Sequence, residues 1–295
     1  MTVTDPVPGA HSAVGVSASE LADAPVNAGP KRHQVVDLLG PFVVFIVFIG
    51  VWYALAYGID GNFAPNGKPL LIPAPHQTFS GVGSVFGKIW SSTQISFWTA
   101  LLGLAIAIVL GVGLAIAMSQ ARWVERALYP YLVALQAVPI LAMIPLIIAI
   151  SGANFRSRVI TTVLISIFPI VSNTLFGLLS AERNQHDLFT LNSATRWTRL
   201  SKLQLPAAMP AMFTGFRISA GLSVIGAVVG DFFFAKGNPG LGRRINDYFL
   251  NNQPSRMTTC AIIAALLGIL FFVTFGWISN IAVGHWHESS RKDAI

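Results

Sequence analysis

The stretch FWTALLGLAIAIVLGVGLAIAM, from Phe97 to Met118, contains no charged residue, and Thr99 supplies its one side-chain hydroxyl. An apolar run of about 20 residues has the length that an α-helix needs to cross a hydrocarbon core of about 30 Å. Strands of a membrane barrel are about half as long and alternate between apolar and polar residues. The run therefore predicts a transmembrane helix.

The whole chain has the composition that this stretch suggests. Apolar residues make up 54% and charged residues 11% of the 295 residues, against roughly 45–50% and 25% in soluble domains. We therefore expect an all-α membrane protein with six transmembrane helices, which would place both termini on one side. The expected spans cover about 38–58, 97–118, 128–150, 159–179, 212–234 and 259–283.

The segments outside these spans carry most of the charge. The formal net charge is +7, and in a membrane protein an excess of Lys and Arg reflects orientation and contact with anionic lipid more often than nucleic acid. We expect membrane lipid and no nucleic acid as a partner. Residues 1–37 lack aromatic residues and a basic start, which predicts a disordered tail rather than a secretion signal, followed by a membrane domain over 38–295.

Sequence signatures of catalysis and nucleotide binding are missing. The nearest approach to a P-loop, GVGSVFGKI from Gly81 to Ile89, has the wrong glycine spacing and an Ile where a hydroxyl should bind magnesium. Neither H-E-x-x-H nor G-x-S-x-G occurs, and Cys260 is the one cysteine. We expect no catalytic residue, no metal and no cofactor.

The fifth span contains two charged residues, Arg217 and Asp231. About 21 Å of helix would separate them, so they cannot pair with each other. A buried carboxylate is costly and is usually kept for a purpose, so Asp231 is a candidate for the substrate pathway or for a structural role. We place Arg156 and Arg158 outside the spans, in the segment that connects the third to the fourth.

Small residues and prolines suggest how the spans pack and bend. Gly226 and Gly230 form a G-x-x-x-G pattern, which predicts the close approach of another helix. Pro139, Pro145 and Pro169 lie inside the third and fourth spans, where each removes a backbone hydrogen bond and can kink the helix.

A basic segment, NSATRWTRLSKLQLPAAMP, separates the fourth and fifth spans. From Leu188, just before this segment, to Leu203 within it, apolar residues recur at every third position, which a straight helix of 3.6 residues per turn cannot keep on one face. We therefore expect two short helices with a bend near residues 193–195 and Thr195 as the N-cap of the second. Pro206 and Pro210 are expected to end that element. A basic helix lying on the membrane surface is the alternative.

This segment resembles the cytoplasmic signature of permease subunits of ATP-binding-cassette importers, in the branch that handles nitrate, sulfonates, taurine and thiamine-precursor pyrimidines. The signature is E-A-A, then Gly after three residues, then Leu-Pro. Asp187-Leu188-Phe189 stands at E-A-A, Ser193 at the Gly, and Leu205-Pro206 at Leu-Pro. GFRISAGLSVIGAVVGDFF and FPIVSNTLFGLL resemble the neighbouring spans of the family. The triplet and Ser193 depart from the pattern.

The resemblance implies a type I importer permease fold in the plasma (inner) membrane, with both termini cytoplasmic. It implies as partners two copies of a cytoplasmic ATP-binding subunit, an extracytoplasmic solute-binding protein and a second permease copy, expected to form a homodimer. The loop over 181–210 would couple to the ATPase through Asp187, Leu188, Phe189, Ser193, Ala194, Arg196, Trp197, Leu200, Leu205 and Pro206. Substrate would pass near the dimer axis, with Met143, Asn173, Ser223 and Asp231 as candidate lining residues.

Two other classes of function remain as rivals. One is a self-contained channel or ion-coupled carrier, and the other is a membrane enzyme that uses Asp231 or the pair His285 and His287. Replacing Trp197 and Leu200 would distinguish an importer permease from these rivals, because a channel or an enzyme would lose little of its activity. The sequence does not choose among the substrates.

Overall fold

The computed structural model describes residues 32–59, 72–80, 82–234 and 236–284, and every regular element in these ranges is helical. The chain divides at Val51 and Trp52 into two units, and all the sites discussed below lie in the second. Helix α2 (Arg32–Ala54) starts within the range expected to be a disordered tail. Residues 1–31 of that expected tail lie outside the described part of the chain.

Five described helices are long and apolar enough to cross a membrane. They comprise the first span over Leu39–Gly58, and those built on α5 (Phe86–Gln120), α8 (Phe155–Leu179), α11 (Leu205–Phe233) and α13 (Pro254–Val283). Each includes almost all of an expected apolar run, so the hydrophobic pattern located these spans correctly.

The expected third span is a bent pair of helices rather than one straight helix. α6 (Arg122–Ala137) and α7 (Ile140–Ser151) meet at an angle of 105°. The break falls at Val138 and Pro139, where Val138 is extended and Pro139 has no N–H to continue the α6 ladder. Counted as one span, the pair brings the total in the described residues to six. One extended residue, Ala121, joins α5 to α6.

Glycines bring α5, α8 and α11 into close contact around one threonine. A methyl group on Gly226 of α11 would lie 2.7 Å from the Cα of Thr162 on α8, and one on Gly103 of α5 would overlap the Thr162 side chain. Gly230 similarly faces the backbone of Arg158, at 3.0 Å. The G-x-x-x-G pattern therefore marks the α8–α11 contact, as expected.

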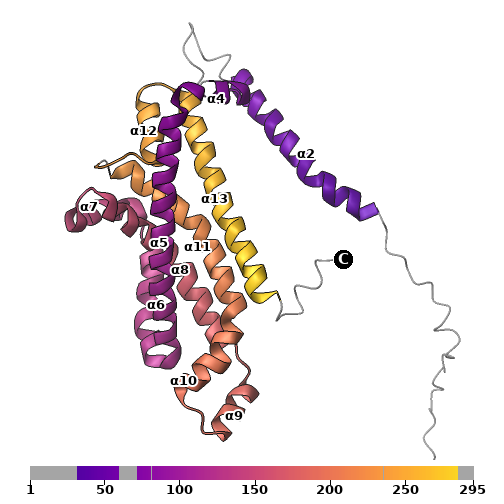
Figure 1. Cartoon of the computed structure of the whole chain (residues 1–295), viewed down its shortest axis with the longest axis vertical. Coiled ribbons are helices and arrows are strands. Elements are labelled where there is room, and N and C mark those ends of the chain that lie inside the picture. Colours follow the sequence, from indigo (N-terminus) through magenta and orange to yellow (C-terminus); the bar gives the residue numbers. More distant parts are fainter. Residues whose placement is uncertain (1–31, 60–71, 81, 235, 285–295) are drawn as a thin grey trace, which may run out of the picture. The chain divides into compact units, whose positions relative to one another are not determined.

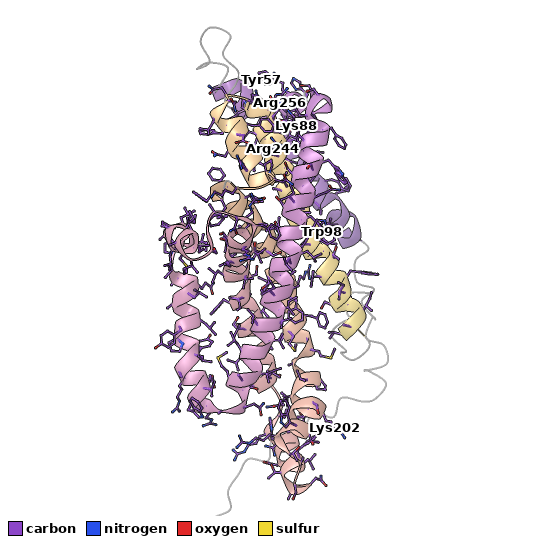
Figure 2. The ribbon with its side chains drawn as sticks, turned by 60° about the vertical axis from the view of Figure 1, so that its left-hand side comes forward. Tyr57, Lys88, Trp98, Lys202, Arg244 and Arg256 are labelled. Carbon is purple, nitrogen blue, oxygen red and sulfur yellow. The ribbon has the colours of Figure 1, made fainter. Side chains whose placement is uncertain are left out.

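The two ends of α11 carry different structures (Figure 1). At its N-terminal end lie α9 (Arg183–Leu191) and α10 (Arg196–Arg199), and at its C-terminal end lies α12 (Leu241–Leu250). Figure 2 shows Lys202 at the first end, and Lys88, Arg244 and Arg256 at the second. The short helix α4 (Pro75–Ser80) also belongs to the second end, where the Thr259 hydroxyl donates to the Thr78 carbonyl at 2.6 Å.

Candidate docking surface and buried ion pair

The basic segment forms two short helices with a bend, as expected. Thr195 caps the N-terminus of α10, accepting a hydrogen bond from the backbone N–H of Thr198 at 3.2 Å. The Arg199 guanidinium donates to the Thr190 hydroxyl at 3.0 Å and so braces α10 against α9. A cap and a side-chain brace hold the bend without burying either helix.

The bend depends on a left-handed residue at Ser193. Its φ is 51°, a conformation that costs most residues about 1–2 kcal/mol and that glycine adopts freely. The backbone N–H of Ala194 reaches back to the carbonyl of Phe189 at 2.9 Å and closes the end of α9. Ser193 occupies the position at which the resembled signature carries Gly, and the backbone geometry accounts for that preference.

The row of apolar residues divides into an exposed and a buried part. Trp197 is 76% and Leu191 82% exposed, and Leu188 is also exposed, whereas Leu200 is 3% exposed and packs in the core. Leu203 is buried as well. We call Leu188, Leu191 and Trp197 the tip surface. Leu200, predicted to contact a partner, is directed instead into this chain, so its replacement would disturb folding as well as docking.

Pro206 does not end the element, contrary to expectation. α10 continues through a π-helical turn, Leu200–Gln204, directly into α11, where Pro206 lies in the first turn and Pro210 inside the helix. Proline has no backbone N–H to donate, but in the first turn of a helix that N–H would have no helical partner. The wider π turn that precedes Pro206 leaves space for its ring. A continuous helical segment therefore connects Arg196 to Phe233.

The other predicted docking residues differ in exposure. Those on the surface are Asp187, Ser193, Arg196 and Pro206, and those partly covered are Phe189, Ala194 and Leu205. Arg196 and Lys202 are exposed, as is Asp187, so charged side chains of both signs lie in the same segment as the tip surface.

The four residues predicted to line a substrate pathway are not gathered in one cavity. Met143 lines a cavity of about 360 Å³ beside the Val138–Pro139 bend, with Gln136, Leu164 and Leu222. Asn173 instead donates to the carbonyl of Pro169 at 2.8 Å, and Ser223 is buried with its hydroxyl bonded to the carbonyl of Ala220. Met143, predicted to line a pathway, therefore does line an open volume.

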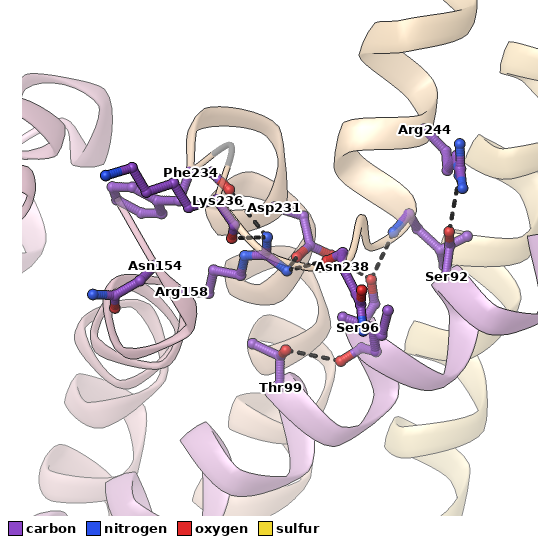
Figure 3. A network of polar contacts seen from close by, with 12 residues as sticks. Ser92, Ser96, Thr99, Asn154, Arg158, Asp231, Phe234, Lys236, Asn238 and Arg244 are labelled. Atoms are coloured by element: carbon purple, nitrogen blue, oxygen red, sulfur yellow. Dashed lines mark hydrogen bonds and ion pairs between the residues drawn. The ribbon is translucent and has the colours of Figure 1, made fainter. Parts of the chain in front are cut away.

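Asp231, the fourth, lies in a fully buried ion pair with Arg158 of α8. The guanidinium Nη1 is 3.0 Å from the carboxylate Oδ1, and the Ser96 hydroxyl of α5 donates to Oδ2. The backbone N–H of Leu241 donates to Ser96 Oγ at 2.8 Å. Figure 3 shows Asp231 between Arg158 and Ser96. The carboxylate therefore ties together three helices and the start of α12.

Arg158 also holds the connection between α11 and α12. Its guanidinium donates to the carbonyls of Phe234, Lys236 and Asn238 at 2.9–3.1 Å. Gly237, at a φ of 94°, turns the backbone so that the carbonyls on both sides of it reach the same guanidinium. Buried charge is tolerated because it is paired and hydrogen-bonded on several sides.

The assignment of Arg158 to an outside segment was wrong. α8 begins at Phe155, four residues before the expected span, and Arg158 is 1% exposed. Asn154 caps this helix by accepting from the backbone N–H of Arg156 at 2.9 Å. A buried Asp231 without a partner in its own span was the signal that a cation from another helix had to face it.

Side chains that bind metal ions do not cluster at either end of α11 in the described part of the chain. Within 32–59, 72–80, 82–234 and 236–284, no three His, Cys, Asp or Glu side chains lie close enough to hold a metal ion. His285 and His287 fall outside the described residues, so the structure does not bear on that pair.

Comparison with known proteins identifies the family to which this chain belongs. Residues 107–284 match the family described as "Binding-protein-dependent transport system inner membrane component". The formylaminopyrimidine transport permease protein ThiX of Halalkalibacterium halodurans is 34% identical over 82% of this chain and 94% of its own length. The riboflavin transport system permease protein RibX of Chloroflexus aurantiacus is also 34% identical, over 69% of this chain and 75% of its own.

Solved structures agree on the fold. The chain is similar to one in the inward-facing MetNI methionine ABC transporter, with a TM-score of 0.53 and 19% identity, covering 67% of this chain and 95% of that one. A chain of an amino acid ABC transporter gives a TM-score of 0.52 at 18% identity, over 69% and 96%. These are permeases of type I importers.

Permeases of this family span the inner membrane several times and work with a separate ATPase, which hydrolyses ATP, and with a substrate-binding protein. The self-contained channel or carrier is not favoured by these relatives. The chain belongs to the binding-protein-dependent transport system inner membrane components, and it is a permease subunit of an ATP-binding-cassette importer rather than an enzyme.

Proposed function

We propose that the tip surface, Leu188, Leu191 and Trp197, is where this permease binds its ATPase. The observation that carries the proposal is the exposure of Trp197 and Leu191 on a braced pair of helices at the end of the membrane domain. Exposed large apolar side chains with a polar border mark interaction sites, and Trp is enriched among the residues that dominate binding energy.

The continuous helix from Arg196 to Phe233 supports a mechanical role for this surface. Movement of an ATPase bound at α10 would be passed along α11, whose glycines pack directly on α8. Because the segment between the proposed docking site and the membrane is helical throughout, displacement at one end would reach the membrane-spanning helices. The proposed coupling loop over 187–206 therefore transmits movement of the ATPase to α11.

The test compares two exposed tryptophans. Trp197→Ala is expected to weaken ATPase binding by about thirtyfold, since truncating a central interface tryptophan costs about 2 kcal/mol or more. Solute-stimulated ATP hydrolysis in proteoliposomes should fall with it. Trp123→Ala is the matched control, because Trp123 is 74% exposed on the first turn of α6. Equal loss in both variants, or none in either, would contradict the proposal.

For the solute we propose a small heterocyclic compound of the vitamin or vitamin-precursor class. The support is that the relatives at 34% identity are named for formylaminopyrimidine and riboflavin, whereas a nitrate permease of Leptolyngbya laminosa is 25% identical. Calorimetric titration of the solute-binding protein that co-purifies with this chain, with pyrimidines, flavins, nitrate and alkanesulfonates, tests it. Tight binding of nitrate or a sulfonate alone would contradict it.

We also propose the complete assembly and its orientation. Two copies of this chain would pair, with two ATPase subunits and one solute-binding protein, and both termini would face the cytoplasm with the tip surface. Support comes from the six spans that result when α6 and α7 are counted as one, and from the placement of α9 and α10 at one end of α11. Mass measurement of the intact complex would test the stoichiometry, and labelling of cysteines introduced at Ser201 and Asn251 would test the sidedness.

A further inference from the structure

A groove runs between α11 and α13, two membrane-spanning helices that lie side by side (Figure 1). It has a volume of about 640 Å³, and every residue that lines it is apolar or glycine. From Ile218 to Val229 it follows about 16 Å of α11, close to the depth of one leaflet in a hydrocarbon core of about 30 Å. Such a lining offers no side-chain hydrogen bond to a polar solute, but it suits a hydrocarbon chain.

Glycines leave the space that forms this groove. A methyl group on Gly221 of α11 would meet no atom within 4 Å, and one on Gly268 of α13 would lie 4.0 Å from the side chain of Val224. Gly226, one turn further along α11, behaves differently, because a methyl group there would press on the backbone of α8 at 2.7 Å. The two groove glycines therefore keep a volume open rather than bring two helices together.

A cation borders the end of the groove that is nearer the tip surface. Arg217 directly precedes Ile218 on α11 and is exposed, and its Cζ lies 4.1 Å from the ring centroid of Phe272, a groove residue on α13. The side chain also passes over Gly276, where an added methyl group would lie 3.1 Å from the Arg217 Nε. Gly276 lies one turn beyond the groove, so the guanidinium extends away from it, as long basic side chains do when they reach toward the membrane surface.

The charge of Arg217 is not neutralised by the described part of the chain. Arg217 forms no ion pair there, and it contacts the face of the Phe272 ring. An arginine exposed on a membrane-spanning helix is costly unless it meets a counter-charge. A lipid phosphate supplies this charge at the membrane surface. A second copy of this chain would offer, from α5, α8, α11 and α13, only the carboxylate of Asp231, which is fully buried. Charge complementarity therefore favours a phospholipid.

We propose that the groove between α11 and α13 holds one acyl chain of a phospholipid whose phosphate pairs with Arg217. The guanidinium supplies charge-assisted hydrogen bonds to the phosphate oxygens, and the open space at Gly221 and Gly268 accommodates the hydrocarbon chain. The site is separate from the tip surface, and its occupancy requires neither the ATPase nor the solute.

The experiment uses the full chain, purified in a neutral detergent and delipidated. Native mass spectrometry counts bound lipid while phosphatidylglycerol is titrated, and a diacylglycerol with the same acyl chains, which lacks the phosphate, is titrated in parallel. We expect phosphatidylglycerol to saturate at one lipid per chain and the diacylglycerol to bind about tenfold more weakly. The same spectra report how many chains each particle contains.

Two glycine variants test the apolar part of the site. Gly221→Leu places a side chain in the open groove without a clash at Cβ, and it should weaken phosphatidylglycerol binding by about tenfold or more. Gly113→Leu is the matched control, because Gly113 of α5 is exposed and its added methyl group also meets no atom within 4 Å. Binding to this control should stay within about twofold.

Two arginine variants test the phosphate contact. Arg217→Gln should weaken phosphatidylglycerol binding by about tenfold, the effect of charge-assisted hydrogen bonds, and should leave diacylglycerol binding unchanged. Arg126→Gln, at an exposed position on α6, should leave both within about twofold.

Absence of saturable phosphatidylglycerol binding would overturn the proposal, as would equal losses in the two glycine variants or in the two arginine variants. If Gly221→Leu instead reduced the number of chains per particle and left lipid binding unchanged, the groove would be a contact between copies of this chain, and the proposal would be wrong.

Discussion

At one end of α11 the chain exposes apolar side chains, and at the other it buries charged ones. Near the start of the helix, the exposed apolar side chains are Leu188, Leu191 and Trp197. Near its end, Asp231 is buried and contacts Arg158 and Ser96. The exposed group gains stability only by binding another protein, whereas the buried group satisfies itself within the chain. The first end is therefore suited to docking and the second to holding α5, α8, α11 and α12 together.

The largest effect is expected from removing the charge of Asp231. Asp231→Asn leaves the buried Arg158 guanidinium without its counter-charge, which should lower the free energy of unfolding by about 3–5 kcal/mol. Thermal unfolding in detergent measures the change. Asp187→Asn, at an exposed position on α9, is the control and should alter stability by less than about 0.5 kcal/mol. Equal shifts would show that the ion pair does not hold this end together.

A smaller effect is expected from the contact between α8 and α11 at Gly226. The methyl group in Gly226→Ala would press on the backbone of Thr162, so we expect a loss of about 1–3 kcal/mol from overpacking. Gly221→Ala, on the same helix, meets no atom within 4 Å and should be neutral or slightly stabilising. Thermal unfolding of the two variants under one condition compares them directly. Equal stability of the two would contradict close α8–α11 packing.

The smallest effect is expected at the bend between α9 and α10. Ser193→Gly removes the left-handed strain, so it should stabilise the bend by up to about 1 kcal/mol, while Ser193→Val should destabilise it. Hydrogen exchange of the backbone amides of residues 188–199 reports this local change. Faster exchange in Ser193→Gly than in Ser193→Val would be incompatible with the described backbone.

Local patterns predicted the membrane-spanning helices well, because a helix that crosses the bilayer needs a long run of apolar residues. The uncharged run from Phe97 to Met118 became the centre of α5, and Thr195 became the predicted N-cap. Pro139 marked the place of the break in the third span, but its angle depends on how α6 and α7 pack, which the sequence of that segment does not specify.

Two features depended on contacts between distant parts of the chain and were missed. Arg158 lies just before an apolar run and was counted as a loop residue, because its partner, Asp231, belongs to another helix. Leu200 was predicted to contact the ATPase, but it lies at the start of the π-helical turn Leu200–Gln204 and is buried in the core. Exposure along the row of apolar residues depends on the turn geometry, which periodicity alone does not reveal.

The most direct measurement of the docking claim is photo-crosslinking in whole cells that express the complete transporter. A photo-reactive phenylalanine would replace Trp197 in one strain and Trp123 in another, two positions of nearly equal exposure. Mass spectrometry would identify the cross-linked protein. We predict that the ATPase subunit is captured from position 197 and not from position 123. Capture of the ATPase from position 123 alone, or from neither position while the transporter stays active, would contradict the account.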